Sequence, residues 1–343
     1  MYIGFYNFYN VYNNNRMFTS ASAALGDDIL YPVVHLGRTL TENGHRVATI
    51  DTDTLEKFDR IVFFDYPTKL NPLFRKLIAM KHPEMYLAAF ECEMLRSDNY
   101  NRNNHRYFKK VFTWRTDIID RKKYFPMNFS SRIICDPSRF DPSCKDRFCT
   151  LIASNKYHGH PNELYSERIR ALRWFECHHP EQFDLYGIGW DRFYFAGHLY
   201  PLNMGLNILY RQAPFLPRVN RFPSYRGPLR VKRDTLARYK FSICYENAIE
   251  PGYITEKIVD CMMAGSIPVY LGAPDIASIF PAASFIDKRR FADYDELYRY
   301  LAGMSAGEHQ RYLDAMRNVL KSTAVYPYSA EGFTELLTRE LFS

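Results

Sequence analysis

Short apolar segments alternate with longer amphipathic segments along the first half of the chain. Apolar runs predict buried strands, and apolar residues at helical spacing predict the helices between them. The expected strands are residues 2–8, 46–51, 58–65, 85–91 and 110–114. The expected helices are residues 31–40, 73–81 and 103–109. This strand–helix–strand rhythm predicts a mostly parallel sheet with helices on both faces.

The same alternation starts again after residues 136–146, a hinge that contains Pro and Ser. The later expected strands are residues 148–153, 183–187, 241–245, 267–271 and 284–287. The later expected helices are residues 163–177, a helix that begins at about residue 255, and residues 294–302 and 307–320. Residues 193–224 read as a long irregular insert rich in Tyr, Pro and Arg.

We therefore expect an α/β fold with two Rossmann-like, doubly wound domains that face a cleft. With 343 residues the chain is too long for a single comfortable core. Residues 1–145 would form the first domain and residues 146–325 the second, while residues 326–343 could return to the first domain. Glycosyltransferases, dehydrogenases and periplasmic binding proteins all have such an architecture, so it leaves the function open.

The chain is basic, with a formal net charge of +7 at pH 7. No acidic residue lies between Arg192 and Arg233, where basic residues accumulate, and a second basic group lies within residues 102–123. Such patches favour phosphate-bearing ligands, anionic glycans or an anionic membrane face. No recognised nucleic-acid module is present, so we do not expect nucleic acid as a partner.

Cysteine and histidine usage indicates a protein without a metal site. The seven cysteines are scattered without a C-x-x-C pair, and the ten histidines show no metal-ligand spacing. This pattern favours reduced, buried thiols in a cytosolic protein. No signal-peptide pattern and no apolar run of membrane-spanning length occurs, so we expect a cytoplasmic protein with at most peripheral association at the inner face of a membrane. The oligomeric state stays open.

Residues 239–272 form the most informative segment of the chain. The strand 241–245 leads into Glu246 and Asn247, a Pro-Gly break follows, and a helix begins near Thr255. Ligands bind at the carboxyl edge of open α/β sheets, and Thr255 is a candidate N-cap at this edge. The unpaired amides of a helix N-terminus suit an anion such as a diphosphate.

The same segment resembles the signature of the α-1,3-fucosyltransferases, glycosyltransferase family 10. The matching residues are Tyr239-Lys240-Phe241, Glu246-Asn247, Gly252-Tyr253-Ile254-Thr255-Glu256-Lys257-Ile258, Ala264-Gly265 and Ile267-Pro268-Val269. The likeness covers most of the C-terminal half and becomes weaker toward the N-terminus. It implies a GT-B fold and inverting transfer of L-fucose from GDP-β-L-fucose to a hydroxyl of a glycan acceptor. It also implies a donor site in the second domain, an acceptor site in the first, and no obligatory metal, with a divalent cation at most stimulatory.

Two alternatives remain open at this stage. The donor could be another GDP-sugar, such as GDP-mannose or a different 6-deoxyhexose, or the chain could be a catalytically silent protein that binds a GDP-sugar or a glycan. The sequence does not identify the acceptor. A lipopolysaccharide or another surface glycan built on the cytosolic side agrees with the basic composition.

The resemblance assigns donor binding to Tyr253, Glu256 and Lys257, with Asn247 beside them. A cation at a helix N-terminus is unfavourable unless an anion binds there, which supports a phosphate role for Lys257.

Members of the family also carry an arginine after a glycine turn. Arg192 matches this residue if one gap is allowed, and Arg226, before Gly227, is the alternative. Together with Lys257, Arg192 would stabilise the departing GDP. Asn155 and Lys156, in the first loop of the second domain, are further candidates for phosphate or ribose contacts.

The resemblance assigns the general base to a glutamate at the end of a strand in the first domain. Glu91 matches it best, with Asn99-Tyr100 downstream, and Glu93 is a rival that strand alternation would put on the same face. The Asp51-Thr52-Asp53 sequence looks like an Asp-x-Asp metal motif, but we expect it to shape a turn. We expect turn or cap roles for Asp28 and Asp65 as well, although either could meet acceptor hydroxyls.

Overall fold

The computed structural model describes residues 1–19, 28–192, 200–212 and 222–343, and contains two parallel sheets. The first sheet has the order β2-β1-β3-β4-β5-β6 and the second has the order β11-β10-β9-β7-β8. The strands of the first sheet are β1 (Tyr2–Asn7), β2 (Arg46–Thr49), β3 (Arg60–Phe64), β4 (Met85–Ala89), β5 (Lys110–Thr113) and β6 (Tyr124–Pro126). The strands of the second sheet are β7 (Arg147–Ile152), β8 (Phe183–Tyr186), β9 (Tyr239–Tyr245), β10 (Ile267–Leu271) and β11 (Ile286–Asp287).

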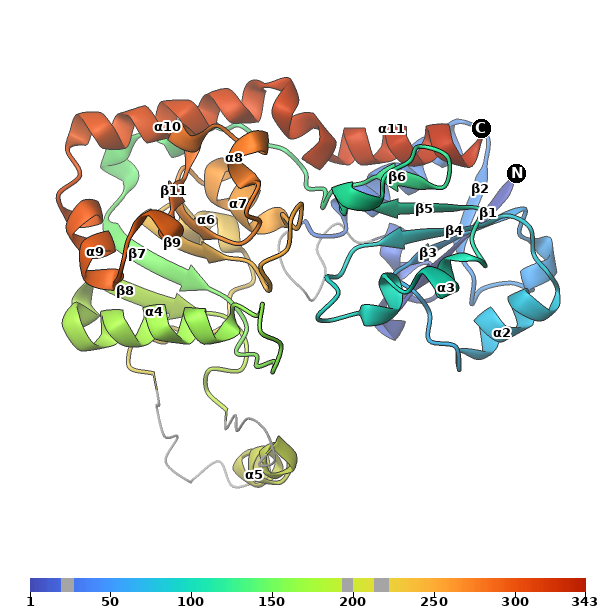
Figure 1. The fold of residues 1–343 in the computed structure, drawn as a ribbon, viewed down its shortest axis with the longest axis horizontal. Helices are drawn as coiled ribbons and strands as arrows, with labels where there is room; N and C mark the ends of the chain where they lie inside the picture. Colours follow the sequence, from blue (N-terminus) through green and yellow to red (C-terminus); the bar gives the residue numbers. More distant parts are fainter. Residues whose placement is uncertain (20–27, 193–199, 213–221) are drawn as a thin grey trace.

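Helices connect and cover the strands of both sheets (Figure 1). The first along the chain are α1 (Tyr31–Glu42), α2 (Pro72–Ala79) and α3 (Arg102–His105), followed by α4 (Tyr165–His178) in the second lobe. Those of the second half are α5 (Tyr200–Gln212), α6 (Lys232–Leu236), α7 (Glu256–Met263), α8 (Ile276–Ile279), α9 (Tyr294–Ala302), α10 (Ala306–Lys321) and α11 (Ala330–Leu341). The expected α/β class with two Rossmann-like halves is confirmed.

Strand β3 shows why the first sheet needs helices on both faces. Its side chains alternate between two separate cores: Val62 and Phe64 lie in one, and Ile61 and Phe63 in the other. All four side chains are buried, which is typical of a strand in a parallel sheet covered on both faces.

The C-terminal helix α11 packs against α1 and the first sheet, so the chain ends in the lobe where it begins (Figure 1). Phe333, Leu337 and Leu341 lie in the same apolar core as residues of β1. The Lys110 Nζ of β5 lies 3.0 Å from Oε2 of Glu340, and both side chains are almost fully buried. Because α11 follows α10 of the second lobe along the chain, the last segment of the chain joins the two lobes.

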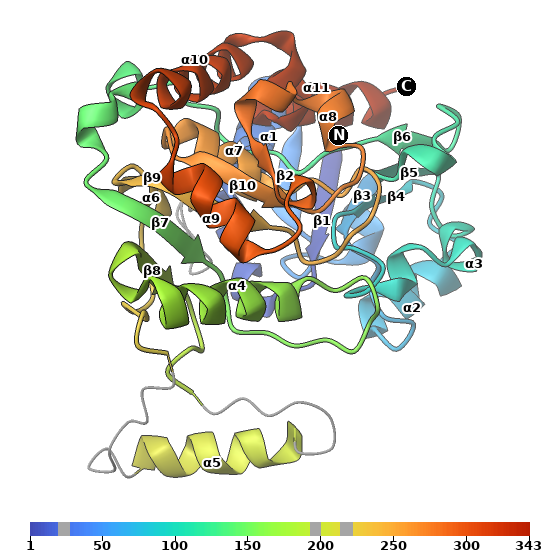
Figure 2. The same ribbon diagram turned by 60° about the vertical axis from the view of Figure 1, so that its left-hand side comes forward.

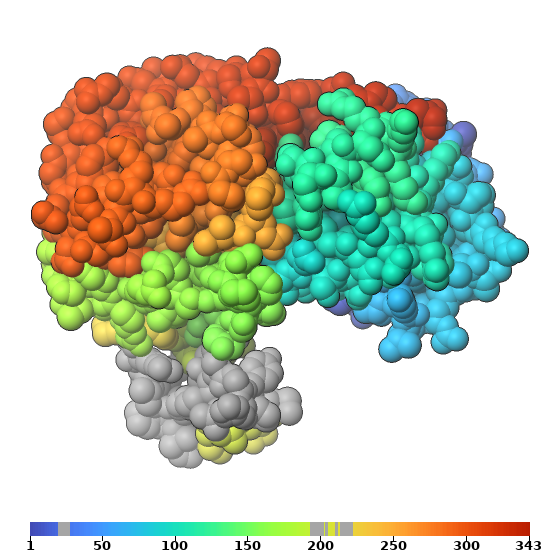
Figure 3. Space-filling model, viewed as in Figure 1, coloured from blue at the N-terminus to red at the C-terminus, as the bar shows by residue number. Residues whose placement is uncertain are grey.

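In each sheet the strand order reverses at the first strand. In the first sheet β1 lies between β2 and β3, and in the second β7 lies between β8 and β9. In open α/β sheets, ligands bind at the carboxyl ends of strands beside such a switch point. Figure 3 shows the two lobes in contact, with the second lobe in orange and green and the first in teal and blue.

Three local predictions need correction. The expected strand 85–91 ends at Ala89, so Glu91 and Glu93 do not follow strand alternation. The expected irregular insert contains α5, which lies apart from both sheets (Figure 2), while residues 193–199 and 213–221 fall outside the described residues. Finally, Cys144 and Cys177 are exposed, although Cys92, Cys149, Cys244 and Cys261 are buried as expected and all seven cysteines are free.

Candidate active site

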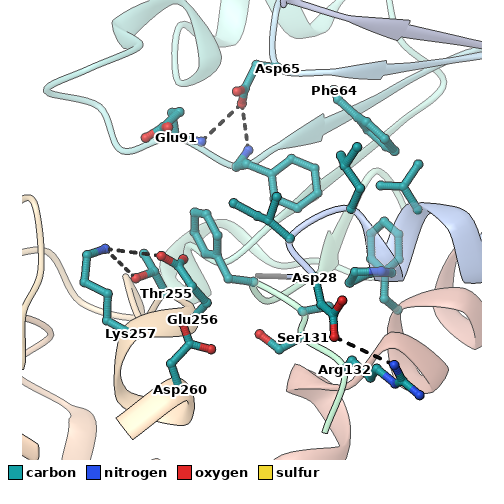
Figure 4. Close-up of a pocket in the computed structure, with 18 of the residues that line it drawn as sticks. Asp28, Phe64, Asp65, Glu91, Ser131, Arg132, Thr255, Glu256, Lys257 and Asp260 are labelled. Atoms are coloured by element: carbon teal, nitrogen blue, oxygen red, sulfur yellow. Dashed lines mark hydrogen bonds and ion pairs between the residues drawn. The ribbon is translucent and has the colours of Figure 1, made fainter. Parts of the chain in front are cut away.

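A cavity of about 280 Å³ lies between the two lobes at the carboxyl ends of β1, β3, β4 and β9 (Figure 4). The first lobe and the segment that follows it contribute Asn7, Phe8, Tyr9, Tyr12, Asp28, Ile29, Leu30, Pro32, Val33, Phe64, Asp65, Phe90, Glu91, Phe129, Ser130, Ser131 and Arg132. The second lobe contributes Lys232, Arg233, Asn247, Tyr253, Thr255, Glu256, Lys257, Asp260 and Met263, and α11 contributes Phe333. A cavity of this size, lined by apolar walls and a few charged groups, is typical of a ligand site.

Lys257 lies in the first turn of α7 and is held by a buried carboxylate. Its Nζ is 3.1 Å from Oε2 of Glu246, whose side chain has no exposed surface, and 2.8 Å from Oγ1 of Thr255. Burial would lower the pKa of Lys257, but the carboxylates of Glu246 and Glu256 hold it above its ordinary value. The cavity therefore has a charged ammonium fixed on the side of the second lobe.

Thr255 occupies the N-cap position of α7, as expected, but it does not cap the helix. Its hydroxyl donates to Oε2 of Glu246 at 2.7 Å, and its backbone amide donates to Oε1 at 2.9 Å. The Thr255 side chain accepts no hydrogen bond from the first-turn amides of α7. These amides remain available to an anion in the cavity.

Glu246 belongs to the segment that matches the signature, but the sequence alone predicted no role for it. Both of its carboxylate oxygens accept hydrogen bonds, and together they fix Thr255 and Lys257. A buried, unpaired carboxylate is very costly, so a glutamate directly after a buried strand indicates a nearby cation. That signal was present in the sequence.

Asn247 and Tyr253 form a second, mostly buried contact on the same side. The Asn247 Nδ2 donates to the Tyr253 hydroxyl at 3.2 Å, and Asn247 Oδ1 accepts from the guanidinium of Arg168 at 3.0 Å. The Tyr253 ring lies 5.0 Å from the ring of Trp114, which belongs to the first lobe. Tyr253 therefore contacts Asn247 of its own lobe and Trp114 of the first lobe, and it also lines the cavity.

Glu256, beside Lys257 in the first turn of α7, also lines the cavity. Burial would raise the pKa of its carboxyl, but the positive charges of Lys257 and Lys232 keep that pKa below its ordinary value. Glu256 is therefore an ionised hydrogen-bond acceptor and can receive a ligand hydroxyl or an imino group. Figure 4 shows it beside Lys257 in the cavity wall.

Glu91 lies across the cavity from Lys257, on the loop after β4 (Figure 4). Its backbone amide and that of Phe90 donate to Oδ1 of Asp65, at 3.2 and 2.8 Å. Its carbonyl accepts from the Tyr100 hydroxyl at 2.7 Å, which gives a function to the downstream Asn99-Tyr100 pair. The backbone of Glu91 is therefore held from both sides.

The side chain of Glu91 has the properties of a general base. Oε2 is buried and has no hydrogen-bond partner among the described residues. Burial and the neighbouring Asp65 carboxylate raise the pKa of Glu91 to about 7. An acid with a pKa near neutrality, aimed into a cavity without a partner, is a candidate for proton transfer.

The structure separates the two rival glutamates. Glu93 does not line the cavity, its side chain is 53% exposed, and it lies 3.0 Å from a guanidinium nitrogen of Arg115. Glu91 alone of the pair faces the cavity.

Asp65 adopts a left-handed backbone conformation, with φ of 62°. This strained turn brings its carboxylate under the two amides of the Glu91 loop, where it also accepts from Asn99 at 2.7 Å. The expected turn role of Asp65 therefore extends to positioning Glu91.

Three further basic residues line the cavity: Arg132, Lys232 and Arg233. The sequence alone did not predict a site role for them. Lys232 lies 3.0 Å from Asp260, and Asp28 lies 3.6 Å from Arg233 and 3.8 Å from Arg132. Lys232 and Arg233 belong to the acid-free stretch noted in the sequence, which was the available signal. Asp28 joins a loop of the first lobe to the second lobe.

The remaining donor candidates do not line this cavity. Asn155 donates to the carbonyl of Gly189 at 3.2 Å, and the exposed Lys156 lies close enough to lower the pKa of Glu91. Arg226 lies 2.6 Å from Asp184, and Arg192 is 64% exposed beside Asp191. The structure brings neither arginine into the cavity.

No group of three or more potential metal-ligating side chains occurs in the part of the chain that the structure describes. Asp53 lies 2.7 Å from Lys57 and accepts from the Thr54 amide at 2.9 Å, so it serves a local turn as expected, whereas Asp51 accepts from the distant Asn14 amide at 2.8 Å and joins two loops. Among the described helices, none is long and apolar enough to span a membrane.

Part of the second lobe matches a known family. Residues 223–319 match the model of glycosyltransferase family 10 (fucosyltransferase), C-terminal part. The matched range includes Asn247, Tyr253, Glu256 and Lys257, and it excludes Glu91. The resemblance expected from the sequence is confirmed.

Two curated relatives align with about a third of the chain. An α-(1,3)-fucosyltransferase of Helicobacter pylori is 36% identical over 110 residues, which is 31% of this chain and 23% of the relative. Human α-(1,3)-fucosyltransferase 7 is 38% identical over 111 residues, which is 30% of this chain and 32% of the relative. The chain thus spans less than a third of the length of either relative.

Solved structures resemble the whole chain in fold. A crystal structure of an α1,3-fucosyltransferase with GDP has a TM-score of 0.56 at 15% identity and covers 100% of this chain and 90% of that one. The corresponding structure with GDP-fucose has a TM-score of 0.51 at 15% identity, with the same coverage. An α-glucosyltransferase in complex with UDP and DNA has a TM-score of 0.56 at 9% identity, covering 92% of this chain and 96% of that one. The fold is the GT-B fold.

Proposed function

We propose that this protein is an inverting fucosyltransferase that moves L-fucose from GDP-β-L-fucose to a hydroxyl of a glycan acceptor. The observation that carries the proposal is the pairing of Lys257 and Glu91 across one cavity. A fixed cation faces an unpartnered carboxylate with a pKa near 7. An inverting transfer needs these two groups on opposite sides of the sugar.

On the donor side, the diphosphate would bind at the N-terminus of α7. The first-turn amides and the Lys257 ammonium supply the positive charge there, and Glu246 keeps the ammonium in place. The GDP that leaves carries more negative charge than it does in the donor, so these groups stabilise the transition state more than the ground state. Lys232 and Arg233 add positive charge to the same lobe.

Of the other donor candidates, Glu256 would receive a ribose hydroxyl or a base imino group. Tyr253 and Asn247 would hold the wall beside it, and Asn155 and Lys156 would approach the donor from the neighbouring loop. Arg192 or Arg226 would reach the diphosphate only after a movement of its segment, because neither lines the cavity.

On the acceptor side, Glu91 would take the proton from the attacking hydroxyl. The oxygen then forms the new bond to C1 of fucose while the C1–O bond to the β-phosphate breaks. GDP departs with the bonding electrons, and the proton remains on Glu91. Attack from the face opposite to the diphosphate turns the β-linked donor into an α-linked product.

The decisive experiment incubates the purified protein with GDP-fucose and a glycan array, and measures fucose incorporation and GDP release. Transfer by the wild type and its loss in Glu91→Gln, with GDP affinity retained, supports the proposal. Preferential turnover of GDP-mannose would show that GDP-mannose, and not GDP-fucose, is the donor. Tight GDP binding without transfer to any glycan would favour a silent binding protein.

We further propose that the reaction takes place at the cytoplasmic face of a membrane, on a surface glycan such as a lipopolysaccharide precursor. The acid-free stretch from Arg192 to Arg233 and the exposed Leu202 and Leu209 of α5 suit an anionic bilayer. Salt-sensitive co-sedimentation with anionic vesicles and none with neutral vesicles is the expected result. Equal sedimentation with anionic and neutral vesicles would contradict an electrostatic contribution to membrane binding.

A further inference from the structure

Three aromatic residues directly after β1 line the cavity beside Glu91: Phe8, Tyr9 and Tyr12, here called the aromatic ledge. Phe8 is 43% exposed and Tyr9 is 48% exposed, although both are large apolar rings. The ledge follows the strand at the switch point of the first sheet, where ligands of such sheets bind. Exposed aromatic rings in a concave site mark a binding surface.

The ledge is held in place by contacts within it and by a guanidinium that covers one face of the Phe8 ring. The Tyr9 amide donates to Oδ1 of Asn7 at 2.7 Å, and the Tyr12 amide donates to the Tyr9 carbonyl at 3.0 Å. The Phe8 and Tyr9 rings meet edge to face, with centroids 5.7 Å apart. The Arg96 guanidinium lies 4.1 Å from the centroid of the Phe8 ring, and Arg96 also donates to the Tyr66 carbonyl. A surface that is already ordered loses little entropy when a ligand binds.

Two polar atoms at this end of the cavity have no hydrogen-bond partner among the described residues. One is the hydroxyl of Tyr12, a side chain that is only 5% exposed, and the other is Oε2 of Glu91. Buried polar atoms are almost always paired, so an unpaired one in a cavity wall indicates a ligand group or an ordered water. Both atoms belong to residues that line the cavity.

Tyr9 lies close to the reacting end of the site. Tyr9, Glu91 and Asp65 line the same cavity, and burial together with the negative charges of the two carboxylates raises the pKa of the Tyr9 hydroxyl. A ligand on Tyr9 would therefore have its hydroxyls within reach of Glu91. The opposite wall, with Lys257, belongs to the donor.

We propose that the aromatic ledge is an acceptor subsite for a hexopyranose ring. Phe8 and Tyr9 contact the C–H face of the sugar, since the negative face of an aromatic ring attracts weakly positive C–H groups. The Tyr12 hydroxyl bonds one hydroxyl of the same sugar, and a neighbouring hydroxyl lies at Glu91. This assignment rests on the proposed transferase function and names the residues that select its acceptor.

The test uses N-acetyllactosamine as the probe, with and without GDP-fucose. Tyr9→Ala and Phe8→Ala are expected to lower kcat/KM for the acceptor roughly five- to thirtyfold each. Tyr12→Phe, which removes only the hydroxyl, is expected to lower it roughly three- to tenfold. Tyr9→Phe keeps the ring and stays near the wild type. Tyr326→Ala is the matched control, because Tyr326 is 46% exposed and lies outside the cavity.

A second readout separates this inference from the proposed function. GDP affinity and the slow hydrolysis of GDP-fucose without acceptor should be the same in all five variants. If no transfer occurs at all, saturation-transfer NMR of the probe on the wild type, Tyr9→Ala and Tyr9→Phe still reports ring contact. The inference is overturned if Phe8→Ala and Tyr9→Ala bind and fucosylate the probe as the wild type does, or if their loss extends equally to GDP affinity.

Discussion

The ammonium of Lys257 and the carboxylate of Glu246 form a pair 3.1 Å apart, in which the glutamate is fully buried and the lysine is 23% exposed. The glutamate comes from the end of β9 and the lysine from the start of α7, so the pair spans the turn that would bind the donor. Because Glu246 has no contact with solvent, its charge depends on this cation and on Thr255. The pair is therefore both a structural element and a part of the site.

Replacing Glu246 by Gln should destabilise the fold and weaken donor binding together. Breaking a buried ion pair by removing one partner costs about 3–5 kcal/mol, and the partial exposure of Lys257 puts the expected loss toward or below the lower end. Glu93→Gln is the control, since Glu93 is 53% exposed and does not line the cavity. Thermal unfolding and GDP titration of both variants provide the measurement. Equal melting temperatures for Glu246→Gln and the wild type would contradict this account.

The activity should rise with pH until Glu91 is ionised. With a pKa of about 7, the base is mostly protonated at pH 6 and mostly ionised at pH 8. Acceptor kcat/KM should therefore climb about tenfold per pH unit below 7 and level off above it. A profile that is flat between pH 5.5 and 8 would exclude Glu91 as the base.

Asp65→Asn should move the ascending limb of that profile to lower pH. The asparagine oxygen can still accept the amides of Phe90 and Glu91, but the negative charge that helps to raise the pKa of Glu91 is gone. The plateau rate changes little if the loop keeps its position. A fall in the plateau without a shift of the limb would show that Asp65 acts on geometry alone.

Glu91 should also make the fold less stable as the pH rises. Its pKa is higher in the folded protein than the ordinary 4.5, so the folded state binds the proton more tightly than the unfolded state. The stabilisation from the bound proton is present at low pH and is lost as the pH rises from about 4.5 to 7, a change on the order of 3 kcal/mol.

Glu91→Gln should therefore melt at a higher temperature than the wild type at pH 8, with a much smaller difference at pH 5. Glu93→Gln is the matched control, because Glu93 is exposed and pairs with Arg115 on the surface. A Glu91→Gln variant that is less stable than the wild type at pH 8 would mean that the carboxylate has a stabilising partner.

The sequence predicted most of the second lobe because its pattern is local. The helix 294–302 was predicted with the bounds of α9, and the strand 267–271 with those of β10. Tyr253, Glu256 and Lys257 belong to one continuous segment, so their common place in the cavity follows from one strand–turn–helix unit. Periodicity and a spaced signature report such units well.

The acceptor side could not be predicted in the same way, because it is assembled from segments far apart in the chain. Asp65 positions Glu91 through a left-handed turn, and alternation along a strand that ends at Ala89 could not separate Glu91 from Glu93. The exposure of Phe8 and Tyr9 is likewise a tertiary property. Nothing in a Phe-Tyr dipeptide after a strand distinguishes a core pair from a surface pair.

Replacing a basic residue that lines the cavity should impair GDP-fucose binding and turnover more than replacing an arginine that does not line it. Lys257→Ala should raise the KM for GDP-fucose and lower kcat, since the ammonium acts on the diphosphate before and during its departure. Lys232→Ala should mainly raise the KM, because Lys232 lines the cavity beside Asp260 at 3.0 Å. Arg226→Ala should leave both constants nearly unchanged, since its guanidinium lies 2.6 Å from Asp184 outside the cavity.

Steady-state kinetics of the three variants at two ionic strengths, with and without EDTA, tests these expectations. EDTA should leave the wild-type rate intact, and a complete loss that Mg²⁺ or Mn²⁺ restores would show that a metal, rather than these cations, neutralises the leaving GDP. A loss in Arg226→Ala as large as that in Lys257→Ala would mean that the segment carrying Arg226 moves to the diphosphate when the donor binds.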